Sequence, residues 1–184
     1  MKSLLLVALL AATPAFAGTA VPVAPFRSIQ LEGGGHVVIR HGATQQVTLV
    51  SGSTEFTKFK VEHDGQLVIS ACNWNCPHHY DLQIEIVTPG LEGAAIEGGG
   101  EIDAAPGFPA QRNIAASIEG GGIVDLRNIS AESADASIEG GGLVKLHAER
   151  ALQASVEGGG EVRYWGSPQV SSSIEGGGNV RPGA

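Results

Sequence analysis

The stretch Ala116–Leu126, which reads Ala-Ser-Ile-Glu-Gly-Gly-Gly-Ile-Val-Asp-Leu, is one copy of a repeat. An apolar residue followed by Glu-Gly-Gly-Gly occurs six times in the 184-residue chain, and these copies contain 18 of its 27 glycines. The six glutamates are Glu32, Glu97, Glu119, Glu139, Glu157 and Glu175. From Glu97 onward the steps between them are 22, 20, 18 and 18 residues. A nearly fixed period of this length indicates stacked repeat units rather than disorder.

Side chains within each copy alternate between two faces. Ala116, Ile118 and the apolar residues at 124 and 126 share one face, whereas Ser117 and Glu119 lie on the other. The stretches 136–146 and 154–164 repeat this pattern, which is typical of half-buried strands. The period is too short for a strand, a helix and a return. It predicts coils of short strands, stacked in parallel so that like residues form columns, with the glycines at a bend. A flexible Gly-rich linker would not keep Ile and Val in register on both sides.

The N-terminus has the pattern of an export signal. Lys2 precedes an apolar run over 4–12, and Ala-Phe-Ala at 15–17 fits a cleavage site, so residues 1–17 are expected to be a signal peptide. Residues 18–25 are expected to be a tether. No later segment is apolar enough to span a membrane. The chain has a formal net charge of −8, which makes it a poor candidate for binding nucleic acid. We therefore expect an exported protein in the periplasm, on the cell surface or in the medium.

Residues 26–184 are expected to form one all-β domain, with about five Gly-rich coils over 91–184. The part over 26–90 lacks the short period, but its alternating stretches still predict strands. These stretches are 26–31, 36–40, 46–51, 56–61, 66–70 and 82–88. We expect this irregular part to cover the first coil, because the end of a stack exposes core and strand edges. Pro182 cannot continue a ladder, so the other end is either weakly capped or used for end-to-end self-association.

These landmarks resemble a known bacterial family. Asp-Gly-Gln-Leu-Val-Ile at 64–69 is followed by Leu-Gln-Ile-Glu-Ile-Val-Thr-Pro-Gly-Leu at 82–91, and then by Gly-rich repeats. Over about 26–180 the chain resembles the putative auto-transporter adhesin head domain, GIN type. The resemblance implies a right-handed parallel β-helix and an exported location, but little about activity. The family's usual turn is similar to Ser-Gly-Ser-Gly-Asp, so Glu-Gly-Gly-Gly replaces a neutral column with a charged one.

Stacked coils would place the repeat glutamates in an outward column. The column would contain Glu97, Glu119, Glu139, Glu157 and Glu175, with Glu32 as a possible extension. Serines at 117, 137, 155 and 173 precede four of these glutamates by two residues on the same face. Carboxylates and hydroxyls are oxygen ligands suited to Ca²⁺, so the column is a candidate cation site. The alternative is a solvated stripe that keeps the protein soluble.

The only two cysteines, Cys72 and Cys76, lie four positions apart. In an exported chain they are expected to form a disulfide. The alternative is a Cu or Zn site made of Cys72, Cys76 and either His78 or His79.

The sequence contains no Gly-x-Ser-x-Gly, no phosphate-binding loop and no His-Glu-x-x-His motif. We therefore expect a non-enzymatic β-solenoid that serves as a binding, adhesion or scaffold module. Its partner would be a surface polysaccharide or a protein. One alternative is a metal-binding protein that uses the Cys/His loop. Another is a polysaccharide-acting β-helix enzyme, although the predicted repeat loops, 127–135 and 147–153, are short for a catalytic cleft.

Overall fold

The computed structural model describes residues 18–72, 75–77 and 79–184. These residues form fifteen strands and no helix, which confirms the all-β expectation. Within this described part, no helix is long and apolar enough to cross a bilayer. The expected signal peptide over 1–17 and His78 lie outside the described residues.

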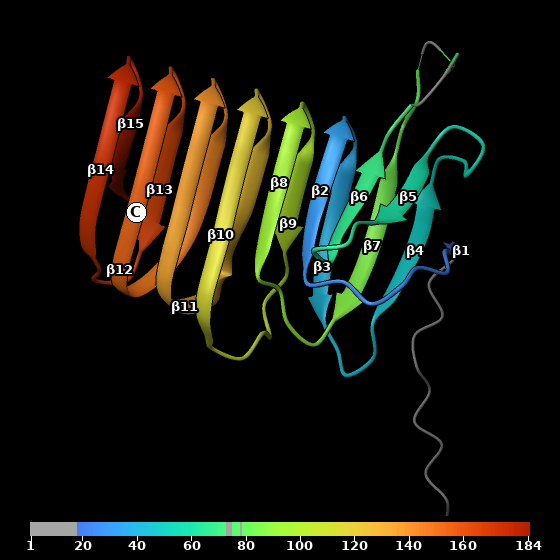
Figure 1. The fold of residues 1–184 in the computed structure, drawn as a ribbon, viewed down its shortest axis with the longest axis horizontal. Coiled ribbons are helices and arrows are strands. Elements are labelled where there is room, and N and C mark those ends of the chain that lie inside the picture. Colours follow the sequence, from blue (N-terminus) through green and yellow to red (C-terminus); the bar gives the residue numbers. More distant parts are fainter. Residues whose placement is uncertain (1–17, 73–74, 78) are drawn as a thin grey trace, which may run out of the picture.

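All fifteen strands belong to one curled sheet with two facing rows (Figure 1). The Glu row contains β5 (Lys58–Val61), β6 (Gln66–Ser70), β2 (Ser28–Gly33), β8 (Gly93–Gly98), β10 (Gln111–Gly120), residues 131–140 of β11 (Ile123–Gly140), residues 151–158 of β12 (Leu143–Gly158) and β14 (Gln169–Gly176). The return row contains β1 (Thr19–Ala20), β4 (Gln46–Ser51), β7 (Gln83–Thr88), β3 (His36–His41), β9 (Glu101–Ala104), the first parts of β11 and β12, β13 (Glu161–Trp165) and β15 (Asn179–Pro182). A coil consists of one Glu-row strand, its glycine turn and the return-row strand that follows.

Successive coils pair in parallel, in the register that the repeat predicts. Glu97 lies beside Glu119, and the same register continues through Glu139 and Glu157 to Glu175. Glu32 also pairs with Glu97, so β2 and β3 form a further coil of the same stack. The sequence predicts about five coils and assigns residues 26–90 to an irregular cover. The first coil was missed because 65 residues separate Glu32 from Glu97, which hides the short period.

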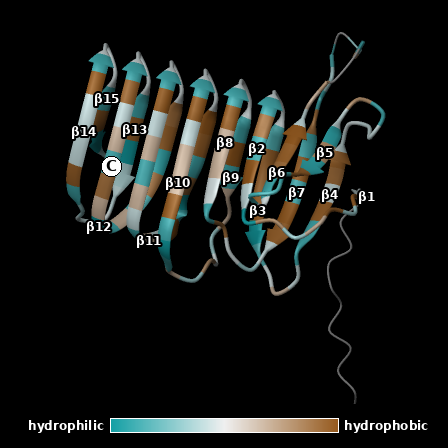
Figure 2. Ribbon diagram, in the orientation of Figure 1, coloured by the Kyte–Doolittle hydropathy of each residue, from teal (hydrophilic) through white to brown (hydrophobic). Residues whose placement is uncertain are grey.

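The core lies between the two rows and follows the alternation. Ile118, Val124 and Leu126 are fully buried, and the equivalent residues of neighbouring coils are also buried. Figure 2 shows the resulting apolar and polar bands along the strands. The branched side chains of one coil therefore pack on those of the next, as expected for a stack whose units contact mainly their neighbours.

The glycine turns allow the coils to approach closely. Gly120 has a φ of 119°, a conformation that L side chains rarely adopt, and a Cβ there would lie 2.4 Å from the Gly98 carbonyl oxygen. The Gly121 amide donates to that oxygen at 2.8 Å. A Cβ on Gly122 would lie 2.8 Å from Cγ2 of Ile96 in the preceding coil. The triple glycine thus allows a sharp turn, and it also lets the backbones of neighbouring turns come close enough to hydrogen-bond to each other.

The corner that leads back to the Glu row differs from the expectation. The segments 127–135 and 147–153, predicted to be loops, lie inside the long strands β11 and β12. Ser130 pairs with His147 and Ala131 with Ala148, and the register shifts on either side of these pairs. The chain turns this corner through local irregularities in the strands, and β11 and β12 stay paired on both sides of it.

The two ends of the stack are different. At the N-terminal end, β4, β5 and β1 pair antiparallel with β7, β6 and β4, and Phe26, Val47 and Leu49 are buried there. At the other end, β14 and β15 are the last strands of their rows, and Ile174 is 43% exposed.

Candidate functional site

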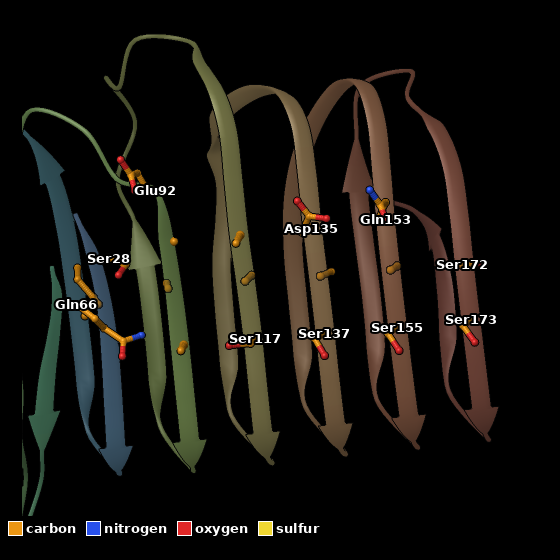
Figure 3. A pocket seen from close by; sticks show the side chains of 18 of the residues that line it. Ser28, Gln66, Glu92, Ser117, Asp135, Ser137, Gln153, Ser155, Ser172 and Ser173 are labelled. Carbon is orange, nitrogen blue, oxygen red and sulfur yellow. The ribbon is translucent and has the colours of Figure 1, made fainter. Parts of the chain in front are cut away.

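An open groove of about 750 Å³ runs across the outer face of the Glu row. It exists because most of the outward positions two and four residues before the repeat glutamates have small side chains. Its lining includes Ser28, Gly93, Ala95, Ala115, Ser117, Ser137, Ser155, Ser171 and Ser173. In Figure 3, Ser117, Ser137, Ser155 and Ser173 lie at the same level on successive strands. The groove therefore presents hydroxyls in register on four successive strands, at a spacing of about 4.8 Å between neighbouring strands.

The groove also contains longer polar side chains. Asp135 and Gln153 are register partners on adjacent coils, and Glu92 and Gln66 lie near its N-terminal end (Figure 3). Glu92 forms a salt bridge with Arg27 at 3.6 Å, and both side chains are exposed. Hydroxyls, an amide and carboxylates at repeated spacing can donate and accept hydrogen bonds along an extended polar ligand.

The repeat glutamates form the expected column on this outer face. From Glu97 to Glu175 their side chains are exposed. At the N-terminal end, Gln30 donates from Nε2 to Glu97 at 2.8 Å and to Glu32 at 3.1 Å, and Ser70 donates to Glu32 at 2.6 Å. Among the described residues, the one set of three side chains that converges as metal ligands lies elsewhere. Calcium binding by the column stays a prediction.

Cys72 and Cys76 form a disulfide, as expected, with their Cα atoms 5.6 Å apart. The loop lies between β6 and β7, and Cys72 and Asn75 both have positive φ. A soft-metal site here would require free thiolates, but the two sulfur atoms are bonded to each other. Of its other proposed ligands, His79 lies in this loop region and His78 falls outside the described residues.

Charged side chains on the outer face of the return row are largely paired. Asp125 accepts from Lys145 at 2.9 Å and forms a salt bridge with Arg127 at 3.2 Å. Arg163 donates to both carboxylate oxygens of Glu161, at 2.9 and 3.0 Å, and Arg181 donates to one of them. The hydrogen bonds from Arg163 are the main reason why the pKa of Glu161 falls to about 2.

A cluster of His36, Glu101 and Asp103 lies on the same face, on β3 and β9. One potential ligand atom from each side chain lies within 4.8 Å of the others, and His36 Nε2 is 2.9 Å from an oxygen of Asp103. The sequence pattern did not indicate this cluster. An alignment of the first two repeat copies would have found it, because His36 and Glu101 each follow the third glycine.

Comparison with one solved structure supports the fold. The chain is similar to a putative adhesin from Bacteroides fragilis NCTC 9343, with 18% identity, a TM-score of 0.50, and 92% of this chain and 98% of that chain covered. A putative adhesin from Parabacteroides merdae ATCC 43184 matches at 16% identity and a TM-score of 0.40, and a putative lipid binding protein from Parabacteroides distasonis ATCC 8503 at 16% and 0.38. Each of these two comparisons covers 91% of this chain and 96% of the other. No curated protein matches the chain.

A family model matches residues 25–108 and 109–168, which is most of the chain. The resemblance seen in the sequence is therefore confirmed, and the chain belongs to the family described as putative auto-transporter adhesin, head GIN domain.

Proposed function

We propose that this protein is an exported, non-enzymatic adhesion module whose groove on the Glu row binds an extended polysaccharide of a cell surface. The groove is the observation that carries the proposal, because it is open and presents hydroxyls in register from coil to coil. The family's description as an adhesin head supports binding rather than catalysis.

The chemistry of the groove favours a neutral or amino-bearing polysaccharide. Its side chains are small hydroxyls and alanines with the polar groups of Asp135 and Gln153, a surface that hydrogen-bonds well but lacks deep apolar pockets. An amphipathic helix would need such pockets for its anchor residues. Glu92, Asp135 and the adjacent glutamate column would repel a polyanion.

In this proposal the fold is a right-handed parallel β-helix, and residues 1–17 are its export signal. The parallel, in-register coils and the family membership support the first point, and the sequence pattern supports the second. A stack of coils provides a straight and rigid floor, which lowers the entropic cost of binding a long ligand.

The test is to measure binding of the purified protein to neutral, amino-bearing and acidic polysaccharides on a glycan array. Ser137→Phe places a ring on the groove floor and should abolish binding. Asn179→Phe adds the same ring at an exposed site on β15 of the return row and should leave binding unchanged. Binding that survives Ser137→Phe, or binding to proteins but to no polysaccharide, would overturn the proposal.

A further inference from the structure

We propose that His36, Glu101 and Asp103 form a binding site for a divalent transition-metal ion, with Zn²⁺ as the best fit. The site lies on the outer face of the return row, whereas the groove lies on the Glu row. It does not depend on the proposed adhesive function.

The backbone fixes the three side chains on one face. His36 and Glu101 are register partners on the parallel strands β3 and β9, and Asp103 follows Glu101 by two residues, so all three point outward from the sheet. Their potential ligand atoms lie within 4.8 Å of one another. Ligand atoms around tetrahedral Zn²⁺ are roughly 3.3–3.5 Å apart, given bonds of about 2.0–2.2 Å. The 2.9 Å separation of His36 Nε2 and Asp103 therefore needs only a small opening.

The charge pattern of this face also favours a cation. Other carboxylates on the return row have cationic partners: Glu85 pairs with Arg40, Asp125 with Lys145 and Arg127, and Glu161 with Arg163 and Arg181. Among the described residues, no Lys or Arg forms a salt bridge with Glu101 or Asp103, and the basic side chain that contacts Asp103 is His36. Asp125 is the register neighbour of Asp103, but Lys145 and Arg127 already engage it. A bound metal ion would supply the positive charge that the other carboxylates obtain from Lys and Arg.

The ligand set selects the class of metal. One imidazole nitrogen with two carboxylate oxygens suits Zn²⁺ and related transition metals, whereas Ca²⁺ prefers six to eight oxygen ligands. All three side chains are partly exposed, so water can complete the coordination. The neutral His36 ring presents Nε2 as a ligand in the tautomer that carries its proton on Nδ1.

The experiment is an isothermal titration of chelator-treated, purified protein with ZnCl₂, with CaCl₂ as a comparison. We expect one equivalent of Zn²⁺ to bind more tightly than Ca²⁺. His36→Ala, Glu101→Gln and Asp103→Asn should each lower the affinity for this Zn²⁺ ion by about tenfold or more. A loss of that size is already typical when a group that only hydrogen-bonds to a metal ligand is removed.

His147→Ala provides the matched control. His147 also lies on the return row and pairs with a carboxylate, Glu149, at 3.1 Å, but it belongs to no set of three ligands among the described residues. Its removal should leave the Zn²⁺ affinity unchanged. Glu101→Gln and Asp103→Asn keep the side-chain shape, and a thermal melt without metal checks that each variant is folded. The absence of Zn²⁺ binding, or an affinity that all three substitutions leave unchanged, would overturn the proposal. Loss of the same equivalent in His147→Ala would overturn it as well.

Discussion

At the scale of single residues, the second and third glycines of a turn face very different surroundings. A Cβ on Gly122 would lie 2.8 Å from Ile96 Cγ2 and 3.0 Å from the Gly100 carbonyl oxygen, whereas a Cβ on Gly121 would meet nothing within 4 Å. We expect Gly122→Ala to lower the free energy of unfolding by about 1–3 kcal/mol, because the preceding coil must shift. Urea denaturation of the purified variant measures this loss.

Gly121→Ala is the internal control for that experiment. Its backbone has no positive φ, so alanine fits without strain and should be neutral or should stabilise by about 0.4–1 kcal/mol through the unfolded state. If both alanines destabilise equally, the close packing between turns is not the reason for the third glycine.

The titration of Glu161 is coupled to folding. The hydrogen bonds from Arg163 lower its pKa in the folded protein to about 2, from an ordinary value of 4.5. The carboxylate therefore contributes stability that is fully present above about pH 4.5 and is lost as the pH falls toward 2. We expect Glu161→Gln to reduce stability by roughly 1 kcal/mol or less at pH 7, as for other exposed ion pairs, and to flatten the stability profile between these pH values. Urea melts at pH 7, 4.5 and 2.5 test this.

Glu55→Gln serves as the comparison for Glu161→Gln. Glu55 is exposed and lies outside the glutamate column, and no described residue forms a salt bridge with it. Its substitution should leave the acid limb of the profile as steep as in the parent. A profile that both substitutions flatten equally would show that Arg163 does not hold Glu161 specifically.

At the scale of the element, a strand's contribution to the stability of the protein depends on whether it has a neighbouring strand on both sides. Ile138 is 1% exposed between two coils, whereas Ile174 is 43% exposed in the last coil. We expect Ile138→Ala to cost about 2–5 kcal/mol and Ile174→Ala clearly less, since truncating a buried side chain leaves a cavity. Denaturant melts of the two variants provide the comparison. Equal losses would contradict a core built by stacking.

The strands of the repeated half could be predicted from the sequence, because alternation and period act together there. Ile118 and Val124 are buried and Glu119 is exposed, as the period of two requires. The antiparallel pairing of β4 with β7 could not be predicted in this way, because a strand pattern does not specify its partner. The continuous path of β11 through a corner was also missed, since its polar residues suggested a loop.

Some of the candidate sites could likewise be predicted from the sequence, and others could not. The glutamate and serine columns follow from the repeat, and the disulfide follows from the spacing of Cys72 and Cys76. The groove depends on which small side chains face outward together on several coils, and the His36 cluster depends on the register between β3 and β9. The groove needs contacts between segments far apart in the chain, which only the folded arrangement supplies, whereas an alignment of the first two repeat copies already places His36 beside Glu101.

At the scale of the whole molecule, one row of like charges extends along the stack. Neighbouring column glutamates lie on strands about 4.8 Å apart, where two unit charges in bulk water repel by slightly less than 1 kcal/mol. Gln30 bridges Glu32 and Glu97, but it reaches only the N-terminal end of the column. Glu119 and Glu139 together take part in three of the four neighbour contacts between Glu97 and Glu175. The column should therefore destabilise the protein at neutral pH and low salt.

The combined change Glu119→Gln with Glu139→Gln removes those three contacts. It should stabilise the chelator-treated protein by no more than roughly 2–3 kcal/mol before salt screening, and about 0.5 M NaCl should shrink the gain. Each 1 kcal/mol corresponds to about 2–4 °C in Tm for a chain of this size. Millimolar Ca²⁺ should raise the Tm of the parent more than that of the variant, by mass action on the folded state. Glu55→Gln with Glu62→Gln removes the same charge away from the column and should change little. A double Gln variant that melts below the parent in chelator would show that the column is not repulsive. A Tm that Ca²⁺ shifts in neither protein would leave the glutamates as a solvated face.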